Sequence, residues 1–253
     1  MQFDLATLLA QWAAGGLAFC WVTTRRREVG LGYGWLLRIT FGALAALSLL
    51  AGWGDGGTGA VIRNVGTALM VVGAVVAFTV SYVRRDDGIE AFDPRLDLVA
   101  PVFGLLGLFG AASFVGGDYA LSLARLLVGA LFLGAVSDAM LLGHWYLVQP
   151  GLGRDPIREL VKIVGVLWPF ELVVWLIPTG MVSVINGTIA DGYEGLIGWM
   201  WVVASLTTLG LVIATWFALE EKSYSAVMAA TGLMYLAILT GFGMDLLPRA
   251  TLS

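Results

Sequence analysis

Cysteine, histidine and charged residues are scarce in this sequence. Its 253 residues include one cysteine, Cys20, and one histidine, His144, and only 13% of them are charged, whereas a soluble domain carries roughly a quarter. A single cysteine excludes an internal disulfide and a CxxC motif. A single histidine excludes a haem held by two histidines, and the usual zinc and copper sites lack ligands. We therefore expect no metal or haem of the protein's own.

The signature motifs of several enzyme classes are absent too. The sequence contains neither a Walker A motif nor a G-x-S-x-G motif. Catalysis by this chain alone is not predicted, although membership of an oxidoreductase complex stays open. No nucleic-acid partner is expected.

Apolar residues dominate instead. They make up 59% of the chain, and the mean hydropathy is +0.88. Apolar runs recur at lengths that span about 30 Å of hydrocarbon. The sequence predicts an all-α polytopic membrane protein, a single integral membrane domain over residues 1–253 with a bundle of about eight transmembrane helices. The predicted spans are Phe3–Thr23, Tyr33–Trp53, Ala60–Val83, Leu96–Val115, Tyr119–Val148, Arg158–Ile185, Gly195–Leu219 and Ser223–Leu246.

Basic residues are concentrated in alternate loops, those after the first, third, fifth and seventh predicted spans. By the positive-inside rule these loops are cytoplasmic, so both termini are expected on the extracytoplasmic side of the inner (cytoplasmic) membrane. The loop from Arg84 to Arg95 is then long enough to dock a partner subunit.

A weak internal repeat appears at an offset of 124 residues. Trp21 aligns with Trp145, Arg38 with Lys162, and Ile39 with Ile163. A four-plus-four duplication accounts for these matches, and so does chance in a composition rich in leucine, glycine and tryptophan. Parallel repeats of that kind occur among transporters.

Two carboxylates lie inside hydrophobic runs, Asp138 and Glu171. A charge at membrane depth costs about 2.5–3.5 kcal/mol on insertion scales, so such residues usually have a function. Both lie about 15 to 18 residues from Gly153 in the connecting segment. At the rise of an α-helix this predicts that both lie at a similar depth, roughly 20–27 Å from that connection. We interpret them as a proton relay. A neutral hydrogen-bonded clasp between two helices is the alternative, and the sequence does not determine whether the two side chains face each other.

A polar and aromatic cluster follows at the predicted cytoplasmic headgroup level. Histidine and tyrosine next to basic residues can bind a quinone headgroup, because they supply donors and a group that titrates near neutrality. The same set suits an anionic lipid headgroup or an anionic solute, or simply interfacial anchoring and topology. The candidate quinone- or lipid-binding residues are His144, Trp145, Tyr146, Gln149, Arg154, Arg158 and Lys162.

Three further charges are predicted near the opposite side: Arg63, Arg125 and Asp245. Arg125 lies about two turns into its helix, so it must either extend to the interface or pair with a carboxylate. Asp118, Asp138 and Asp245 are the candidate partners. We interpret these charges as structural ion pairs.

Three functions remain open from the sequence. The first is an integral subunit of a respiratory or other electron-transfer complex, which binds quinone or lipid and conducts protons. The second is a proton-coupled transporter of a small solute, with the carboxylates as coupling site. The third is a scaffold or accessory subunit without chemistry. The expected partners are the lipid bilayer and other membrane or peripheral subunits.

Overall fold

The computed structural model describes residues 3–88 and 92–252, and every regular element within those ranges is a helix. The predicted all-helical membrane protein is confirmed at this level. Residues 89–91, inside the loop predicted to dock a partner, lie outside the described residues. The helices are α1 (Leu5–Thr24), α2 (Leu31–Ala51), α3 (Thr58–Val83), η1 (Arg85–Asp87), η3 (Pro94–Leu98), α4 (Val99–Phe114), α5 (Tyr119–Trp145), α6 (Asp155–Leu176), α7 (Gly180–Ile185), α8 (Leu196–Ala218) and α9 (Tyr224–Thr251).

Seven helical segments within the described residues are long and apolar enough to cross a membrane. Their outward-facing side chains are mostly apolar, which suits contact with lipid tails rather than water. The protein is therefore a multi-pass helical membrane protein. The seven segments are α1, α2, α3, η3 with α4 (Pro94–Phe114), α5, α8 and α9.

The structure differs most from the prediction at the sixth predicted span. Instead of one helix over Arg158–Ile185, α6 ends at Leu176 and the short α7 begins at Gly180. The break lies at Pro178, since the residue before a proline is driven out of helical conformation and Ile177 is extended. Pro169, by contrast, lies inside a continuous α6. Helix α6 is more charged than the seven apolar segments.

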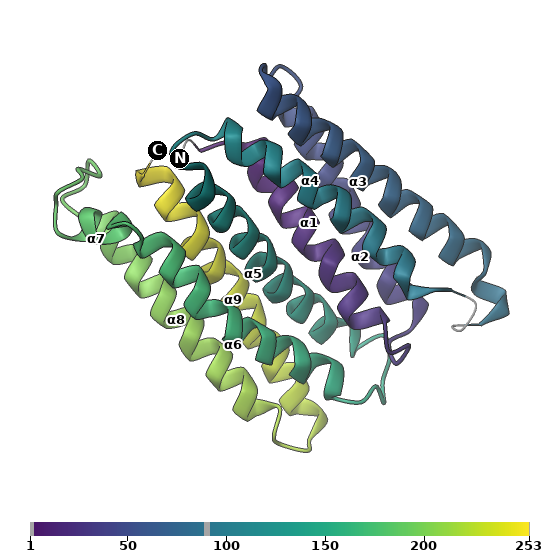
Figure 1. The fold of residues 1–253 in the computed structure, drawn as a ribbon. Helices are drawn as coiled ribbons and strands as arrows, with labels where there is room; N and C mark the ends of the chain where they lie inside the picture. The colour runs from purple at the N-terminus through teal and green to yellow at the C-terminus, as the bar shows by residue number, and fades with distance from the viewer. Residues whose placement is uncertain (1–2, 89–91, 253) are drawn as a thin grey trace.

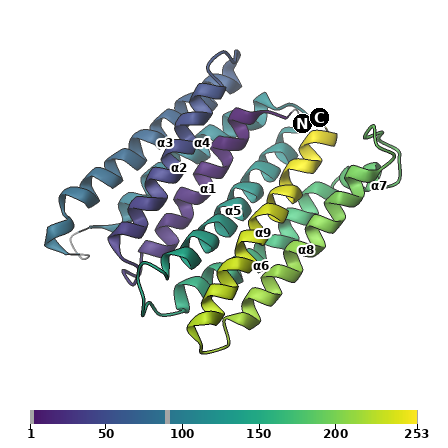
Figure 2. The same ribbon diagram turned by 180° about the vertical axis from the view of Figure 1, so that it is seen from behind.

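The helices form two groups of four. In the first group α1 packs on α2, α2 on α3, α3 on α4 and α4 on α1, and in the second α5, α6, α8 and α9 pack in the same cyclic order. Contact between α1 and α5 joins the groups. Figure 1 and the reverse view in Figure 2 show α5 in the middle of the molecule, with α2 and α3 on one side and α6 and α8 on the other.

Glycines allow the close approach of α1 and α5. A Cβ on Gly15 would lie 1.7 Å from the carbonyl oxygen of Ala130, and one on Gly134 would lie 2.3 Å from the carbonyl carbon of Gly15. Neither side chain could be accommodated without moving backbone. Small residues at such positions let membrane helices pack backbone against backbone.

Both ends of the described chain lie at the same end of the bundle (Figures 1 and 2). We call it the terminal end. The opposite end, where the α1–α2, α3–η3, α5–α6 and α8–α9 connections lie, carries most of the basic residues. We call it the basic end.

Candidate functional site

The two carboxylates that the sequence places at one depth lie in opposite halves of the bundle. Asp138 is seven residues before α5 ends at Trp145, about 10 Å from the basic end at 1.5 Å per residue. Glu171 is five residues before α6 ends at Leu176, about 8 Å from the terminal end. The predicted common layer is wrong, because residues 146–154 form a connecting loop rather than further helical turns.

Asp138 is fully buried where α5 meets α2 and α1. The hydroxyl of Tyr33 donates to its Oδ1 at 3.0 Å and also approaches its backbone oxygen at 3.1 Å. Its Oδ2 is buried and has no hydrogen-bond partner among the described residues. The hydroxyl of the preceding residue, Ser137, accepts from the indole of Trp12 at 2.8 Å. One carboxyl oxygen of Asp138 therefore accepts a hydrogen bond from Tyr33, and the other accepts none from the described residues.

A buried ion pair lies at the same end and was not predicted. The guanidinium of Arg38 donates to both oxygens of Asp97, at 2.7 and 2.8 Å, and the hydroxyl of Thr24 donates to Asp97 at 3.0 Å. Arg38 and Asp97 are each 3% exposed. The signal in the sequence was a lone arginine inside the predicted span Tyr33–Trp53. The pair ties α2 and η3 to α1.

Glu171 belongs to a different cluster at the terminal end. The indole of Trp175 donates to its Oε1 at 2.8 Å, while Oε2 is buried without a hydrogen-bond partner in the described chain. Asp245 and Arg249 of α9 are close enough for their charges to act on the Glu171 carboxyl. Glu171 thus faces a second carboxylate, but that carboxylate is Asp245 rather than Asp138.

Asp245 is neutralised within its own helix. Arg249, one turn later, donates to both of its oxygens at 2.8 and 2.9 Å, and also to the side-chain oxygen of Gln11 at 2.7 Å. Gly129 of α5 makes room for this cluster, because a Cβ there would lie 2.2 Å from Gln11 Nε2 and 2.8 Å from Asp245 Oδ1. The partner of Asp245 is therefore Arg249, from the same helix.

Arg125 makes no ion pair within the described residues. Its guanidinium donates to the carbonyl oxygens of Val174 at 3.0 Å and Ile177 at 2.8 Å, and lies 4.6 Å from the centre of the Trp175 ring. These carbonyls are freed where α6 ends before Pro178. The expected carboxylate partner is thus replaced by the end of a helix, an arrangement that sequence spacing does not reveal.

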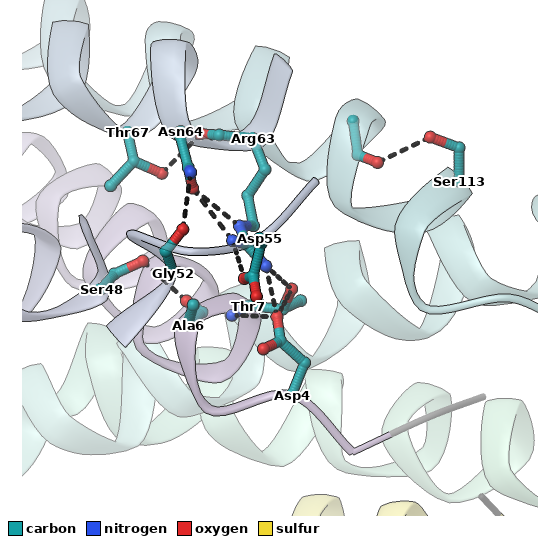
Figure 3. Close-up of polar contacts among 11 residues, drawn as sticks. Asp4, Ala6, Thr7, Ser48, Gly52, Asp55, Arg63, Asn64, Thr67 and Ser113 are labelled. Carbon is teal, nitrogen blue, oxygen red and sulfur yellow. Dashed lines mark hydrogen bonds and ion pairs between the residues drawn. The ribbon is translucent and has the colours of Figure 1, made fainter. Parts of the chain in front are cut away.

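Arg63 is the centre of a cluster at the terminal end (Figure 3). Its guanidinium is fully buried and pairs with Asp4 at 2.6 Å and with Asp55 at 2.5 Å, while Asn64 accepts from it and donates to the backbone of Gly52. These contacts join the start of α1, the α2–α3 loop and α3. The geometry is that of a structural ion pair.

The residues predicted to bind a headgroup do not form one site, because each contacts a different part of the protein. Gln149 accepts from the indole of Trp145 at 3.1 Å and from the backbone N–H of Gly30 at 2.9 Å, which fixes the α1–α2 loop. The ring of His144 is exposed and forms no hydrogen bond with the described residues. Tyr146 is buried and donates to the carbonyl of Gly153 at 2.5 Å. Burial raises the pKa of the Tyr146 phenol, so it is a neutral donor.

The basic members of that cluster lie against α8. Arg154 donates to backbone oxygens in the α8–α9 connection, and Arg158 donates to the carbonyl of Leu219 at 2.7 Å. Arg158 and Lys162 also line a groove of about 500 Å³, which we call the α6–α8 groove. Its lining residues are Arg26, Arg158, Glu159, Lys162, Ile163, Val166, Leu167 and Trp216. Of the predicted headgroup residues, only these two contribute to it.

Comparisons of the chain with protein-family models, with curated proteins and with solved structures find no match. What the protein does is therefore inferred from its own residues.

Proposed function

We propose that this chain is an integral membrane subunit of an electron-transfer complex, without haem or metal of its own, and that it conducts protons. The observation that carries the proposal is the pair of fully buried carboxyls, Asp138 and Glu171, each with an oxygen left without a hydrogen-bond partner among the described residues. Buried polar atoms without partners are rare and call for an explanation. A carboxyl that takes up and releases protons explains such an atom, because the oxygen without a partner can accept a proton.

The two carboxyls divide the proton path into two stations. At the basic end, Asp138 holds or releases a proton with the Tyr33 hydroxyl as its donor. At the terminal end, Glu171 faces Asp245, whose charge is compensated by Arg249. Because Arg249 is already paired with Asp245, Glu171 is the carboxyl that would take up and release the proton at this station. Ser137, which accepts from Trp12, adds a polar group beside Asp138, and Gln11, which accepts from Arg249, adds one at the terminal end.

This proposal includes eight transmembrane helices with both termini extracytoplasmic, in the inner membrane. Helix α6 would be the eighth span. Its charged residues are tolerated because Glu171 faces α9, while the others lie in its first two turns near the basic end. Partner subunits would dock at the basic end, where Arg84 and Arg85 are exposed. The quinone or lipid of this proposal would bind in the α6–α8 groove.

A proton-coupled transporter of a small solute is the second candidate. It is favoured by the two four-helix groups that pack in the same cyclic order. A four-plus-four duplication would produce that order, and two similar halves can rock against each other around a shared site. Glu171, beside the break between α6 and α7, would then be the coupling group. An accessory scaffold without chemistry is the third candidate.

Purification in a gentle detergent separates these candidates. An electron-transfer subunit is expected to copurify with redox proteins and with quinone in the lipid extract. A protein that is monodisperse and free of both, yet accumulates a solute in vesicles under a pH gradient, would overturn the subunit proposal in favour of transport.

Proton conduction is tested by reconstitution of whichever form is purified, the complex or the chain alone. With a potassium diffusion potential as driving force and a pH-sensitive dye inside the vesicles, Asp138→Asn and Glu171→Gln are each expected to lower proton flux at least tenfold. Asp87→Asn, an exposed carboxylate in η1, is the matched control. Equal flux in all three variants and the unmodified protein would contradict the relay.

A further inference from the structure

We infer that the α6–α8 groove is a binding site for an anionic phospholipid, with the phosphate at the basic end and one acyl chain along the groove. This inference rests on the lipid-binding part of the proposed function, and it requires only that the basic end lies at a membrane surface, not that the chain belongs to an electron-transfer complex.

The groove is charged at the basic end and apolar further into the membrane, as a phospholipid is charged at its headgroup and apolar along its acyl chains. Along one face of α6, Arg158, Lys162 and Val166 follow each other at intervals of four residues. Residues four apart lie one above the other on a helix, so charge gives way to apolar surface with depth. Arg158 lies three residues after α6 begins at Asp155 and Val166 eleven, about 5 and 16 Å into the helix. A headgroup followed by the start of an acyl chain has this spacing.

The charge balance of the groove favours an anion. Three cations line it, Arg26, Arg158 and Lys162, against one carboxylate, Glu159. That carboxylate is already engaged, with Arg25 at 2.5 Å and with Arg26 at 3.3 Å. The amine of Lys162 has no hydrogen bond or ion pair with the residues that the structure describes, and its side chain is exposed.

A phosphate fits this excess of positive charge better than a quinone. Arg and Lys bind phosphate through strong charge-assisted hydrogen bonds, and each basic residue near a surface contributes about a fivefold gain in affinity for anionic lipid. A neutral quinone ring accepts hydrogen bonds but leaves the charges uncompensated.

The remaining lining of the groove is apolar and open to lipid. Val166 of α6 is 55% exposed and Trp216 of α8 is 39% exposed, and Ile163 and Leu167 complete the walls. Trp216 lies two residues before α8 ends at Ala218, at the basic end. An indole at that level is typical of the membrane interface. It also provides a reporter inside the groove.

The test measures quenching of Trp216 by lipids brominated on one acyl chain, in mixed micelles or nanodiscs of the purified protein. The Trp216 signal is the difference between the unmodified protein and Trp216→Phe. Brominated phosphatidylglycerol is expected to quench this signal at least fivefold more effectively than brominated phosphatidylcholine. Lys162→Gln is expected to weaken the preference about fivefold, and Glu159→Gln to strengthen it. Arg85→Gln, an exposed cation of the basic end outside the groove, is the matched control and should change nothing.

Four outcomes would overturn the inference. The first is equal quenching by the two lipids, and the second is an equal loss in Lys162→Gln and Arg85→Gln. The third is competition by inorganic phosphate at millimolar concentration, which would make the site one for a soluble anion. The fourth is displacement of phosphatidylglycerol by decylubiquinone with an affinity that Lys162→Gln leaves unchanged, which would assign the groove to quinone.

Discussion

The hydroxyl of Tyr33 donates to Oδ1 of Asp138 at 3.0 Å, and both side chains are fully buried where α2 meets α5. This hydrogen bond joins α2 to α5 through only one of the two carboxyl oxygens. A clasp would use both carboxyl oxygens to hold two helices together, whereas here Oδ2 has no partner among the described residues.

Removal of the Tyr33 hydroxyl should therefore destabilise the fold more than replacement of the Asp138 carboxyl by an amide. Tyr33→Phe removes the hydroxyl that donates to Oδ1 of Asp138, and we expect the free energy of unfolding to fall by about 1–3 kcal/mol. Asp138→Asn keeps an acceptor for Tyr33 and avoids a buried charge, so its effect should be smaller. Thermal unfolding in detergent compares the two. A larger loss for Asp138→Asn would indicate that the carboxyl is structural.

The Arg38–Asp97 pair should be sensitive to the loss of one partner and tolerant of the loss of both. Arg38→Gln or Asp97→Asn leaves a buried charge uncompensated, which typically costs about 3–5 kcal/mol. Arg38→Gln combined with Asp97→Asn removes both charges and should unfold less readily than either single variant. The measurement is a double-mutant cycle of unfolding midpoints.

An exposed pair is the control for that cycle. Arg85 lies 3.7 Å from Asp86, and both side chains are largely exposed. Exposed pairs contribute about 0–1 kcal/mol. If Arg85→Gln were as harmful as Arg38→Gln, burial would not be the reason for the sensitivity of the Arg38–Asp97 pair.

The contact between α1 and α5 should not accept even a methyl group. Gly15→Ala would place its Cβ 1.7 Å from a backbone oxygen of α5, so the helices must separate. Overpacking of this kind costs about 1–3 kcal/mol. Gly210→Ala, in α8 with nothing within 4 Å of the added carbon, is the matched control and should be neutral or slightly stabilising. Equal midpoints for the two variants would contradict the close approach.

The loop before α8 should lose hydrogen-exchange protection at low pH. The Asp191 carboxylate accepts from the backbone N–H groups of Gly195, Tyr193 and Ile197, each at 2.9 Å, and these bonds lower its pKa. A pKa lower in the folded than in the unfolded state stabilises the fold above about pH 4, and this contribution disappears as the pH falls further.

Hydrogen exchange of residues 193–197 checks this prediction. Protection should fall below about pH 4 in the unmodified protein, after correction for the intrinsic exchange rate. Asp191→Asn carries no titrating group, so its protection should be lower and independent of pH. A pH-dependent loss that persists in Asp191→Asn would assign the effect to another group.

Much of the fold follows from local sequence. Apolar runs with turn residues between them determine where the helices lie, because a chain in lipid must satisfy its backbone hydrogen bonds within each segment. The predicted span Ala60–Val83 agrees with α3 (Thr58–Val83) within two residues. The prediction failed at Pro178, which ends α6 inside a predicted span, and at residues 146–148, where α5 ends three residues earlier than predicted and a hydrogen-bonded loop begins.

The sequence by itself determined that Asp138, Glu171, Arg63 and Arg125 are charges within or beside apolar helices. Only the tertiary structure decided their partners. Asp138 meets Tyr33 from a helix 105 residues away in the sequence, Glu171 meets α9, and Arg125 meets the end of α6. The physical reason is that residue type and periodicity fix where a side chain lies along its own helix, whereas the packing and rotation of neighbouring helices fix which other group it reaches.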